Sequence, residues 1–461
     1  MTTRIRTSRH WWVIFGLTLV ALTAYLGWRG RHRVREFLRQ QQTQQQQTSL
    51  KILSPSNPSR SSAASIQVTK NDWPFWRGFD GSNSTPDASI PVQWSETENV
   101  RWKTEIPGRG HSSPCVLNGR IYLTTALAEQ KAQQLICVNL QSGKVLWVQD
   151  VHRGEFIHSN PKNSHASSTV VTDGSAVFTV FAVNGHIWLS SFTPEGTVNW
   201  QCEVGPYVSK EGFGASPVIV GPLVVVAADN VNLSWIAGID RQSGDIRWRR
   251  PRGTGTSYGS PALISQNDRP VIVMAGLDRV AGISFDTGDE LWKLPGPDLS
   301  ASTPVFGDEL LFATGCAASS GIYAFRMGES PELLWNHKIK AEVPSPLYHA
   351  GQVYIAQDNG ILNCYDAVSG EQLWRHRVGG NLWASPIRCG DNLYVTSDTG
   401  KTVVMKSGPV YEEVAVNTIE CEGVFATPVP IQGQLLVRSL SHLYCIGASD
   451  ASPVASGIGA R

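Results

Sequence analysis

The chain of 461 residues lacks the short motifs that mark the common enzyme classes. Its eight cysteines include no Cys-x-x-Cys pair, so a zinc site or a thioredoxin-type redox centre has no support. The glycine-rich stretch 253–259 lacks the Gly-x-Gly-x-x-Gly spacing, and it joins two predicted strands instead of opening a helix. This excludes a phosphate-binding loop. No nucleophile elbow of the serine hydrolases is found between a predicted strand and a helix.

Positive charge is scarce outside the N-terminus. The net charge is +1, yet the first forty residues hold eight arginines and one glutamate, so the rest of the chain is acidic. Nucleic-acid binding needs clustered lysine and arginine side chains to neutralise phosphates. We therefore expect no nucleic-acid partner.

Short alternating strands take the place of helices. In 345–378 the pattern predicts strands at 346–349, 353–357, 362–366 and 372–378, with turns at Ala350-Gly351 and Ser369-Gly370. Valine, isoleucine, tyrosine and tryptophan alternate there with polar residues, which is typical of a half-buried antiparallel meander.

This unit recurs eight times, at spacings of about 40 to 55 residues, which is the range of propeller and solenoid repeats. Each copy opens on a Ser/Thr mark: Ser113-Pro114, Ser168-Thr169, Ser216-Pro217, Ser260-Pro261, Thr303-Pro304, Ser345-Pro346, Ser385-Pro386 and Thr427-Pro428. Four strands per copy predict an all-β, eight-bladed propeller. The eighth copy has only three strands, and 100–106 supplies a fourth, so we expect an N-terminal strand to close the ring and remove its free edges.

Tryptophans close most copies, usually four residues after a turn glycine. The fifth copy has an altered turn at 328–331, and the seventh has Val414 near the expected position. We expect each indole to dock between neighbouring blades and bury on the order of 200 Å². The docking residues are Trp102, Trp147, Trp200, Trp248, Trp292, Trp335 and Trp374.

The motifs Asp366-x-x-Ser369-Gly370-x-x-x-Trp374 and Asp240-x-x-Ser243-Gly244-x-x-x-Trp248 resemble the tryptophan-docking repeat of pyrroloquinoline-quinone (PQQ)-like propellers. The resemblance covers residues 72 to 447. That superfamily includes quinoprotein alcohol and glucose dehydrogenases. It also includes the non-enzymatic lipoprotein scaffold of bacterial outer-membrane β-barrel assembly. The segment 72–83 further resembles the opening of membrane-anchored members found in planctomycete-type bacteria.

The resemblance implies two alternative functions. A quinoprotein oxidoreductase of alcohols or sugars would hold PQQ and calcium at the ring axis. This chain has no adjacent cysteine pair, no long insertions and no Glu/Asn/Asp set that matches the family's ligand positions. We therefore expect no catalytic residues, no metal and no cofactor, and we favour the scaffold-like alternative.

Composition divides the chain into six segments. These are a cytoplasmic n-region (1–10), a transmembrane signal anchor (11–28), a basic then Gln/Ser/Pro-rich linker (29–70), an aromatic clasp (71–98), the propeller (99–447) and a disordered tail (448–461). Residues 11–28 carry no charge and could cross about 27 Å of hydrocarbon. A cleaved signal peptide is the alternative, but 25–28 is a poor cleavage site. Arginines after the apolar run favour a cytoplasmic propeller, whereas the family resemblance favours export; we expect a single-pass membrane protein with a periplasmic propeller.

Candidate binding residues lie in the loops that precede the first strand of each blade, because these loops converge on one mouth of the channel. They are Arg109, His111, His158, Asn160, Asn163, His165, Glu211, Tyr258, Glu342, Trp383 and Glu422. The loop 152–165 is the richest, and long loops are often functional. The alternative is that these are turn formers and packed or solvated histidines; a metal site on His158 and His165 is a lesser possibility.

The sequence therefore predicts a membrane-anchored, extracytoplasmic propeller with a recognition function. Its partner would be an envelope protein, or a small-molecule or polysaccharide ligand that stacks on Trp383, Tyr258 and Phe425. Cysteines at repeat-equivalent positions are expected to be small buried hydrophobes. A pair between Cys202 and Cys421 stays open.

Overall fold

A computed structural model describes residues 68–69, 72–316 and 321–448. Within these ranges the regular elements are β-strands, as the alternating pattern predicts. The predicted n-region, transmembrane anchor, most of the linker and the tail lie outside the described residues. No helix in the described ranges is long and apolar enough to span a bilayer.

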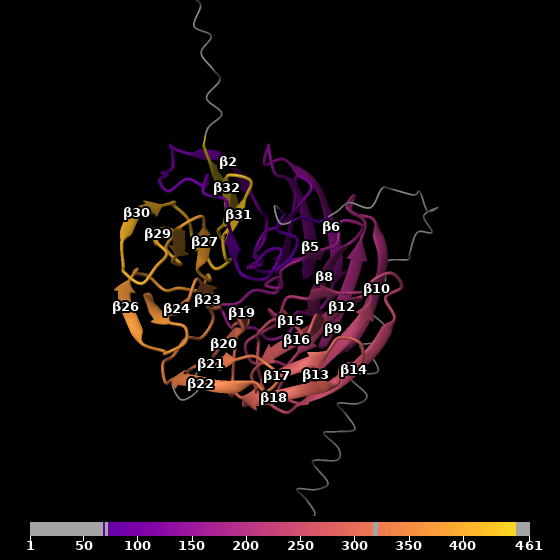
Figure 1. Cartoon of the computed structure of the whole chain (residues 1–461). Coiled ribbons are helices and arrows are strands. Elements are labelled where there is room, and N and C mark those ends of the chain that lie inside the picture. Colours follow the sequence, from indigo (N-terminus) through magenta and orange to yellow (C-terminus); the bar gives the residue numbers. More distant parts are fainter. Residues whose placement is uncertain (1–67, 70–71, 317–320, 449–461) are drawn as a thin grey trace, which may run out of the picture. The chain divides into compact units, whose positions relative to one another are not determined.

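The strands form seven four-stranded sheets and one five-stranded sheet, which confirms the eight-bladed propeller (Figure 1). Blades 1 to 4 consist of β3 (Cys115–Leu117), β4 (Arg120–Leu127), β5 (Ala132–Asn139) and β6 (Val145–Arg153); β7 (Val171–Thr172), β8 (Val177–Val183), β9 (His186–Phe192) and β10 (Val198–Pro206); β11 (Val218–Val220), β12 (Leu223–Ala228), β13 (Ser234–Asp240) and β14 (Ile246–Gly253); and β15 (Ala262–Gln266), β16 (Arg269–Ala275), β17 (Arg279–Ser284) and β18 (Glu290–Pro295).

Blades 5 to 8 follow in order. They consist of β19 (Val305–Gly307), β20 (Leu310–Thr314), β21 (Ile322–Arg326) and β22 (Glu332–His337); β23 (Leu347–His349), β24 (Gln352–Gln357), β25 (Ile361–Asp366) and β26 (Gln372–Arg377); β27 (Ile387–Cys389), β28 (Asn392–Thr396), β29 (Lys401–Lys406) and β30 (Glu413–Thr418); and β31 (Val429–Ile431), β32 (Gln434–Arg438) and β33 (His442–Gly447) with β2 (Val100–Glu105). The four strands predicted in blade 6 are confirmed to within one residue at each end.

The last blade is built from both ends of the propeller sequence. Strand β2 pairs antiparallel with β33, with Trp102 opposite Cys445. The fully buried Arg438 of blade 8 then reaches into blade 1, where its guanidinium donates to the carbonyl oxygens of Ser112 and Thr124. Strand pairing and this guanidinium therefore both join blade 8 to blade 1.

Tryptophan indoles contact the turn glycines of the next blade. The Trp335 indole donates to the Ala367 carbonyl oxygen at 3.0 Å, and a Cβ placed on Gly370 would lie 2.8 Å from its ring. Gly370 has a φ of +74°, so the turn can approach the indole closely only because glycine adopts it freely. The same packing joins Trp102 to Gly143, Trp147 to Gly196, Trp200 to Gly244 and Trp248 to Gly288.

Blades 4 and 7 lack this contact between a tryptophan indole and a turn glycine of the next blade. The indole of Trp292 donates to Gln266 of its own blade, and the fifth blade's altered turn offers no packed glycine. In blade 7 the docking position, paired with Val404, is occupied by Ala415. Trp94 of the clasp fills this interface instead. It stacks on Tyr394 at 6.3 Å, in a cluster with residues of blades 7 and 8.

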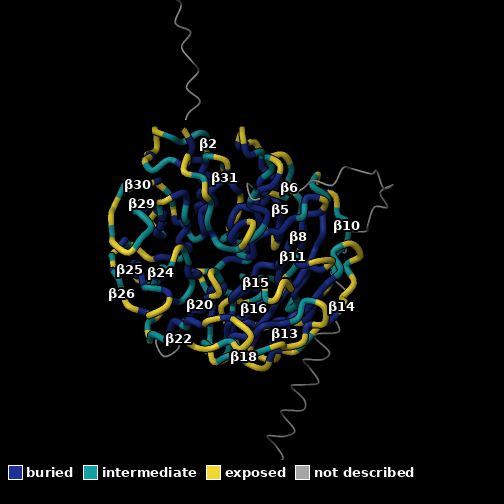
Figure 2. The backbone as a smooth tube through the Cα atoms, viewed as in Figure 1, coloured by how far each residue is buried: buried dark blue, intermediate teal, exposed yellow. Residues whose placement is uncertain are grey.

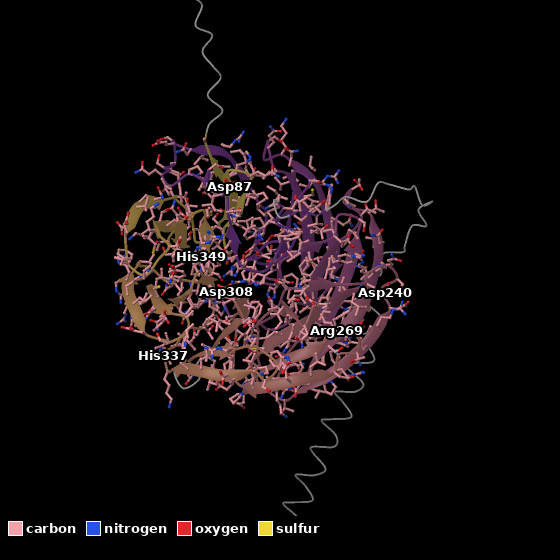
Figure 3. The ribbon with its side chains drawn as sticks, viewed as in Figure 1. Asp87, Asp240, Arg269, Asp308, His337 and His349 are labelled. Carbon is pink, nitrogen blue, oxygen red and sulfur yellow. The ribbon has the colours of Figure 1, made fainter. Side chains whose placement is uncertain are left out.

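The aromatic clasp crosses the channel from one side of the ring to the other. Trp73 pairs with Val116 of blade 1, and the Trp76 indole donates to the Thr303 hydroxyl of blade 5 at 2.8 Å. Blades 1 and 5 lie on opposite sides of an eight-bladed ring, so the segment crosses the axis. It continues as β1 (Ser84–Thr85), parallel to β27. Asp87, which is labelled in Figure 3, then accepts a hydrogen bond from the Gly433 N–H. The clasp therefore ties together blades far apart in sequence.

Burial follows the blades. The inner strands are buried, and exposed residues gather in turns and on the outer strands (Figure 2). All eight cysteines are free thiols, and five of them are buried. Cys202 lies in β10 of blade 2, and Cys421 lies in the connection between blades 7 and 8.

Candidate functional site

A cavity of about 710 Å³ occupies the channel, at the mouth formed by the loops that precede the first strands. Seven of the predicted residues line it: His111, Asn160, Asn163, Glu211, Tyr258, Glu342 and Trp383. The other four lie outside the lining. His158 and Glu422 are exposed, with Glu422 held by the Ser441 hydroxyl; Arg109 is on the rim; and His165 packs on Phe156 with ring centroids 4.4 Å apart.

An aromatic stack crosses one side of the mouth. Trp383 stacks on Phe425 at 6.2 Å, and Phe425 stacks on His111 at 4.5 Å with an interplanar angle of 5°. The Lys162 ammonium lies 4.8 Å from the Trp383 ring centroid, a cation–π contact. The stack therefore joins the loops before blades 8, 1 and 7 to the loop 152–165.

Burial and positive neighbours keep His111 neutral. They lower its pKa to about 3, with desolvation as the largest cause and the charges of Arg109 and Arg438 adding to it. Desolvation disfavours the charged imidazolium, and nearby cations act in the same direction. His111 is therefore an uncharged stacking partner at physiological pH, not a proton donor.

The loop 152–165 is fastened across the mouth at several points. The Asn160 amide donates to the Glu211 carboxylate at 2.6 Å, and the Asn163 amide donates to the Glu211 backbone oxygen at 2.8 Å. On the other side, the Arg109 guanidinium donates to the Pro161 carbonyl oxygen. These bonds fix the position of the loop and of its side chains at the mouth.

Glu342 and Asp358 lie close together on the blade 6 side of the mouth. The Glu342 N–H donates to an Asp358 carboxylate oxygen at 2.9 Å, and Lys340 forms an ion pair with Glu342. Burial, followed by the charge of Glu342, raises the pKa of Asp358 to about 6. Sequence reasoning missed Asp358, because it lies after the second strand of the blade, away from the loops that were searched.

Part of the cavity lining was also not predicted from the sequence. Trp76 of the clasp lines the cavity, and no repeat partner placed it there. The Ser/Thr marks that open the copies line it as well, except that of the sixth copy, although in the sequence they served only to count blades. A Gly-x-Ser-x-Gly match at 255–259 has no catalytic geometry, because the buried Ser257 hydroxyl donates to the Ser300 backbone oxygen at 2.6 Å.

The lining does not match the needs of a calcium-bound quinone. Calcium takes six to eight oxygen ligands, yet among the described residues Glu211 and Glu342 are the only carboxylates in the lining, and they come from the loops before blades 3 and 6. Asn160 and Lys340 already engage them. Among the described residues no three His, Cys, Asp or Glu side chains cluster closely enough to hold a metal ion.

The blades, the docking tryptophans and the closing strand define a PQQ-like β-propeller. The family model described as "Outer membrane protein assembly factor BamB" matches residues 91–201, 131–376 and 318–449. The chain belongs to this family.

Individual relatives are distant. The assembly factor BamB of Yersinia pestis is 20% identical over 355 residues, covering 69% of this chain and 80% of that protein. BamB of Burkholderia pseudomallei is 30% identical over 188 residues, covering 40% and 45%.

Among solved structures, BamB from Moraxella catarrhalis has a TM-score of 0.56 at 16% identity, covering 75% of this chain and 98% of that one. A quinohemoprotein alcohol dehydrogenase from Comamonas testosteroni has a TM-score of 0.60 at 12% identity, covering 83% and 82%. These structural likenesses show the fold alone.

Proposed function

We propose that this protein is a membrane-anchored, extracytoplasmic recognition propeller, a scaffold that binds an envelope partner at the channel mouth and performs no catalysis. The observation that carries the proposal is the arrangement of the channel mouth. Hydrogen bonds hold its loops in place, and aromatic, cationic and amide groups from loops of separate blades converge there on one cavity. Family membership supports it, since the curated relatives are named outer membrane protein assembly factors. Concave sites with a few convergent polar groups are the usual recognition sites of folded domains.

The membrane anchor is the part of this proposal that rests on residues 11–28. Their uncharged, aromatic-flanked sequence is long enough to span a bilayer. If residues 11–28 span the bilayer, alkaline carbonate extraction of native membranes would leave the full chain in the membrane pellet. Digestion of the propeller by protease added to spheroplasts would place it outside the inner membrane, whereas protection would place it in the cytoplasm. Release of the chain by carbonate would contradict the anchor.

Site-directed photo-crosslinking in cells tests the mouth. Tyr258 lines the cavity and is replaced by p-benzoyl-phenylalanine in the full-length protein. Leu291, in the outer strand of the same blade and 56% exposed, carries the same probe as the matched control. We expect a discrete protein adduct from position 258 that is absent from position 291. No adduct at 258, or the same adduct at both positions, would count against a protein partner at the mouth.

The quinoprotein alternative keeps one observation in its favour, the fold likeness to alcohol dehydrogenases. Calorimetric titration of the protein with PQQ in calcium tests it directly, with Glu342→Gln as the variant. We expect no heat of binding. Micromolar binding that the variant loses would establish the cofactor and redirect attention to alcohols and sugars as substrates.

A further inference from the structure

A belt of hydroxyls encircles the channel. It consists of the Ser/Thr side chains at the opening of the eight blades: Ser113, Thr169, Ser216, Ser260, Thr303, Ser345, Ser385 and Thr427. Backbone N–H groups of belt residues donate to the hydroxyl of the next blade at 2.8–3.0 Å, from Ser113 to Thr169, Thr169 to Ser216, Ser216 to Ser260, Thr303 to Ser345, Ser345 to Ser385 and Ser385 to Thr427. Thr303 accepts from the Trp76 indole.

Seven of the eight hydroxyls, all except that of Ser113, accept a hydrogen bond, but none of the eight donates its own proton to an acceptor among the described residues. The Ser113 hydroxyl has no partner at all, although the residue is only 3% exposed. A serine or threonine hydroxyl carries one proton to donate, and a buried donor without an acceptor costs free energy. Seven belt residues line the cavity, all except Ser345. The Ser113 hydroxyl oxygen is itself enclosed by protein, so the cavity presents up to six neutral O–H donors around one axis.

Most charged groups around the cavity are already engaged. Glu342 is paired with Lys340, Glu211 accepts from Asn160, and Lys162 lies over Trp383. Lys210 is exposed at the rim. The deeper surface is thus uncharged and rich in donors, which suits a neutral, oxygen-rich ligand better than an ion.

The cavity has a floor. Trp76 lines it, and the clasp crosses the axis at this depth. Leu299 and Val343 add apolar wall, against which the C–H groups of a ligand can pack. A cavity closed on one side admits the end of a chain and not its middle. Stacking on Trp383 and Phe425, expected from the sequence, is disfavoured, because these rings are engaged with one another and with Lys162 and His111.

We propose that this cavity binds the terminal units of a neutral glycan, with the hydroxyl belt donating to the sugar oxygens. The proposal builds on the mouth as the recognition site in the proposed function and names a ligand class for it. A volume of about 710 Å³ falls within the range of small-molecule sites.

Calorimetry on the full-length protein tests this. The protein is held in lauryldimethylamine oxide, because maltoside detergents are themselves sugars, and it is titrated with maltotriose, chitotriose and mannotriose. Citrate and inorganic phosphate serve as anionic counter-probes. We expect saturable binding of at least one trisaccharide with a Kd below about 1 mM.

The variants separate the ligand site from the fold. Ser385→Ala removes a cavity-lining donor and the acceptor of one inter-blade bond, whereas Ser345→Ala removes only the equivalent inter-blade acceptor, at the same 2.9 Å, outside the lining. We expect Ser385→Ala to weaken binding about fivefold, the effect of one neutral hydrogen bond, and Ser345→Ala to leave it unchanged.

Three results would overturn the proposal. They are the absence of trisaccharide binding up to about 10 mM, tighter binding of citrate or phosphate than of any sugar, or equal losses in the two variants. Sugar binding without a crosslinked protein would support the glycan site and contradict the protein partner. A crosslinked protein without sugar binding would support the protein partner and contradict the glycan site.

Discussion

Adding one methyl group at a turn glycine tests whether indole docking holds the blades together. Gly370 and Gly351 both belong to blade 6, and both have a positive φ, +74° and +81°. A Cβ on Gly370 would lie 2.8 Å from the Trp335 ring, whereas a Cβ on Gly351 would meet nothing within 4 Å. Gly370→Ala and Gly351→Ala therefore share the backbone strain and differ in the contact with the neighbouring blade.

The magnitude follows from these contacts. An alanine in the left-handed region costs about 1–2 kcal/mol, and this applies to both variants. At Gly370 the indole must also move, which adds overpacking of about 1–3 kcal/mol. If the movement breaks the 3.0 Å hydrogen bond from Trp335 to Ala367, about 1 kcal/mol more is lost. We expect Gly370→Ala to be less stable than Gly351→Ala by about 2–4 kcal/mol.

Urea denaturation followed by far-ultraviolet circular dichroism measures the difference, since this signal does not depend on the tryptophan that moves. The m-values of the two variants should agree, so that the midpoints report stability. Equal midpoints would refute the reasoning, because the strain would then account for the whole effect and the docked indole would contribute nothing.

Three further predictions concern interfaces and titration. Trp374→Ala should lower the free energy of unfolding by about 3–5 kcal/mol, the usual cost of truncating a buried tryptophan, and an unchanged melting curve would contradict its role. Trp94→Ala should destabilise by a similar amount, because its stacking on Tyr394 fills the position where blade 7 lacks a tryptophan. The folded-state pKa of Asp358, about 6, lies above the unfolded value of about 3.9, so the folded protein binds more protons between these values and its stability falls as pH rises through this window. Asp358→Asn should flatten that fall in denaturation midpoints measured from about pH 4 to pH 7.

The fold could be predicted in detail because a propeller repeats one local pattern. Each strand of blade 6 is set by alternation and turn glycines within the blade, so no long-range information is needed. The exchange of β2 into the last blade was also visible, because the eighth copy lacked a strand that 100–106 could supply.

The site was less predictable, because it depends on which loops meet across the channel. The sequence placed His111 and Trp383 in separate loops but not in one stack through Phe425, since stacking is decided by tertiary geometry. Trp76 enters the cavity from a segment with no repeat partner. Asp240 could be placed with confidence at a blade turn because its motif is local, and it lies at the outer side of the ring (Figure 3).

The pairing of β2 with β33 makes completion of the ring a late event in the life of each molecule. The outer strand of the last blade is synthesised before every other blade, while its partner leaves the ribosome or the translocation channel after all of them. Until then, both strands present open edges, the feature that chaperones shield and proteases exploit. A chain interrupted during synthesis would lack β33 and keep an unpaired strand edge that is open to pairing with other chains, so only the full-length product closes the ring.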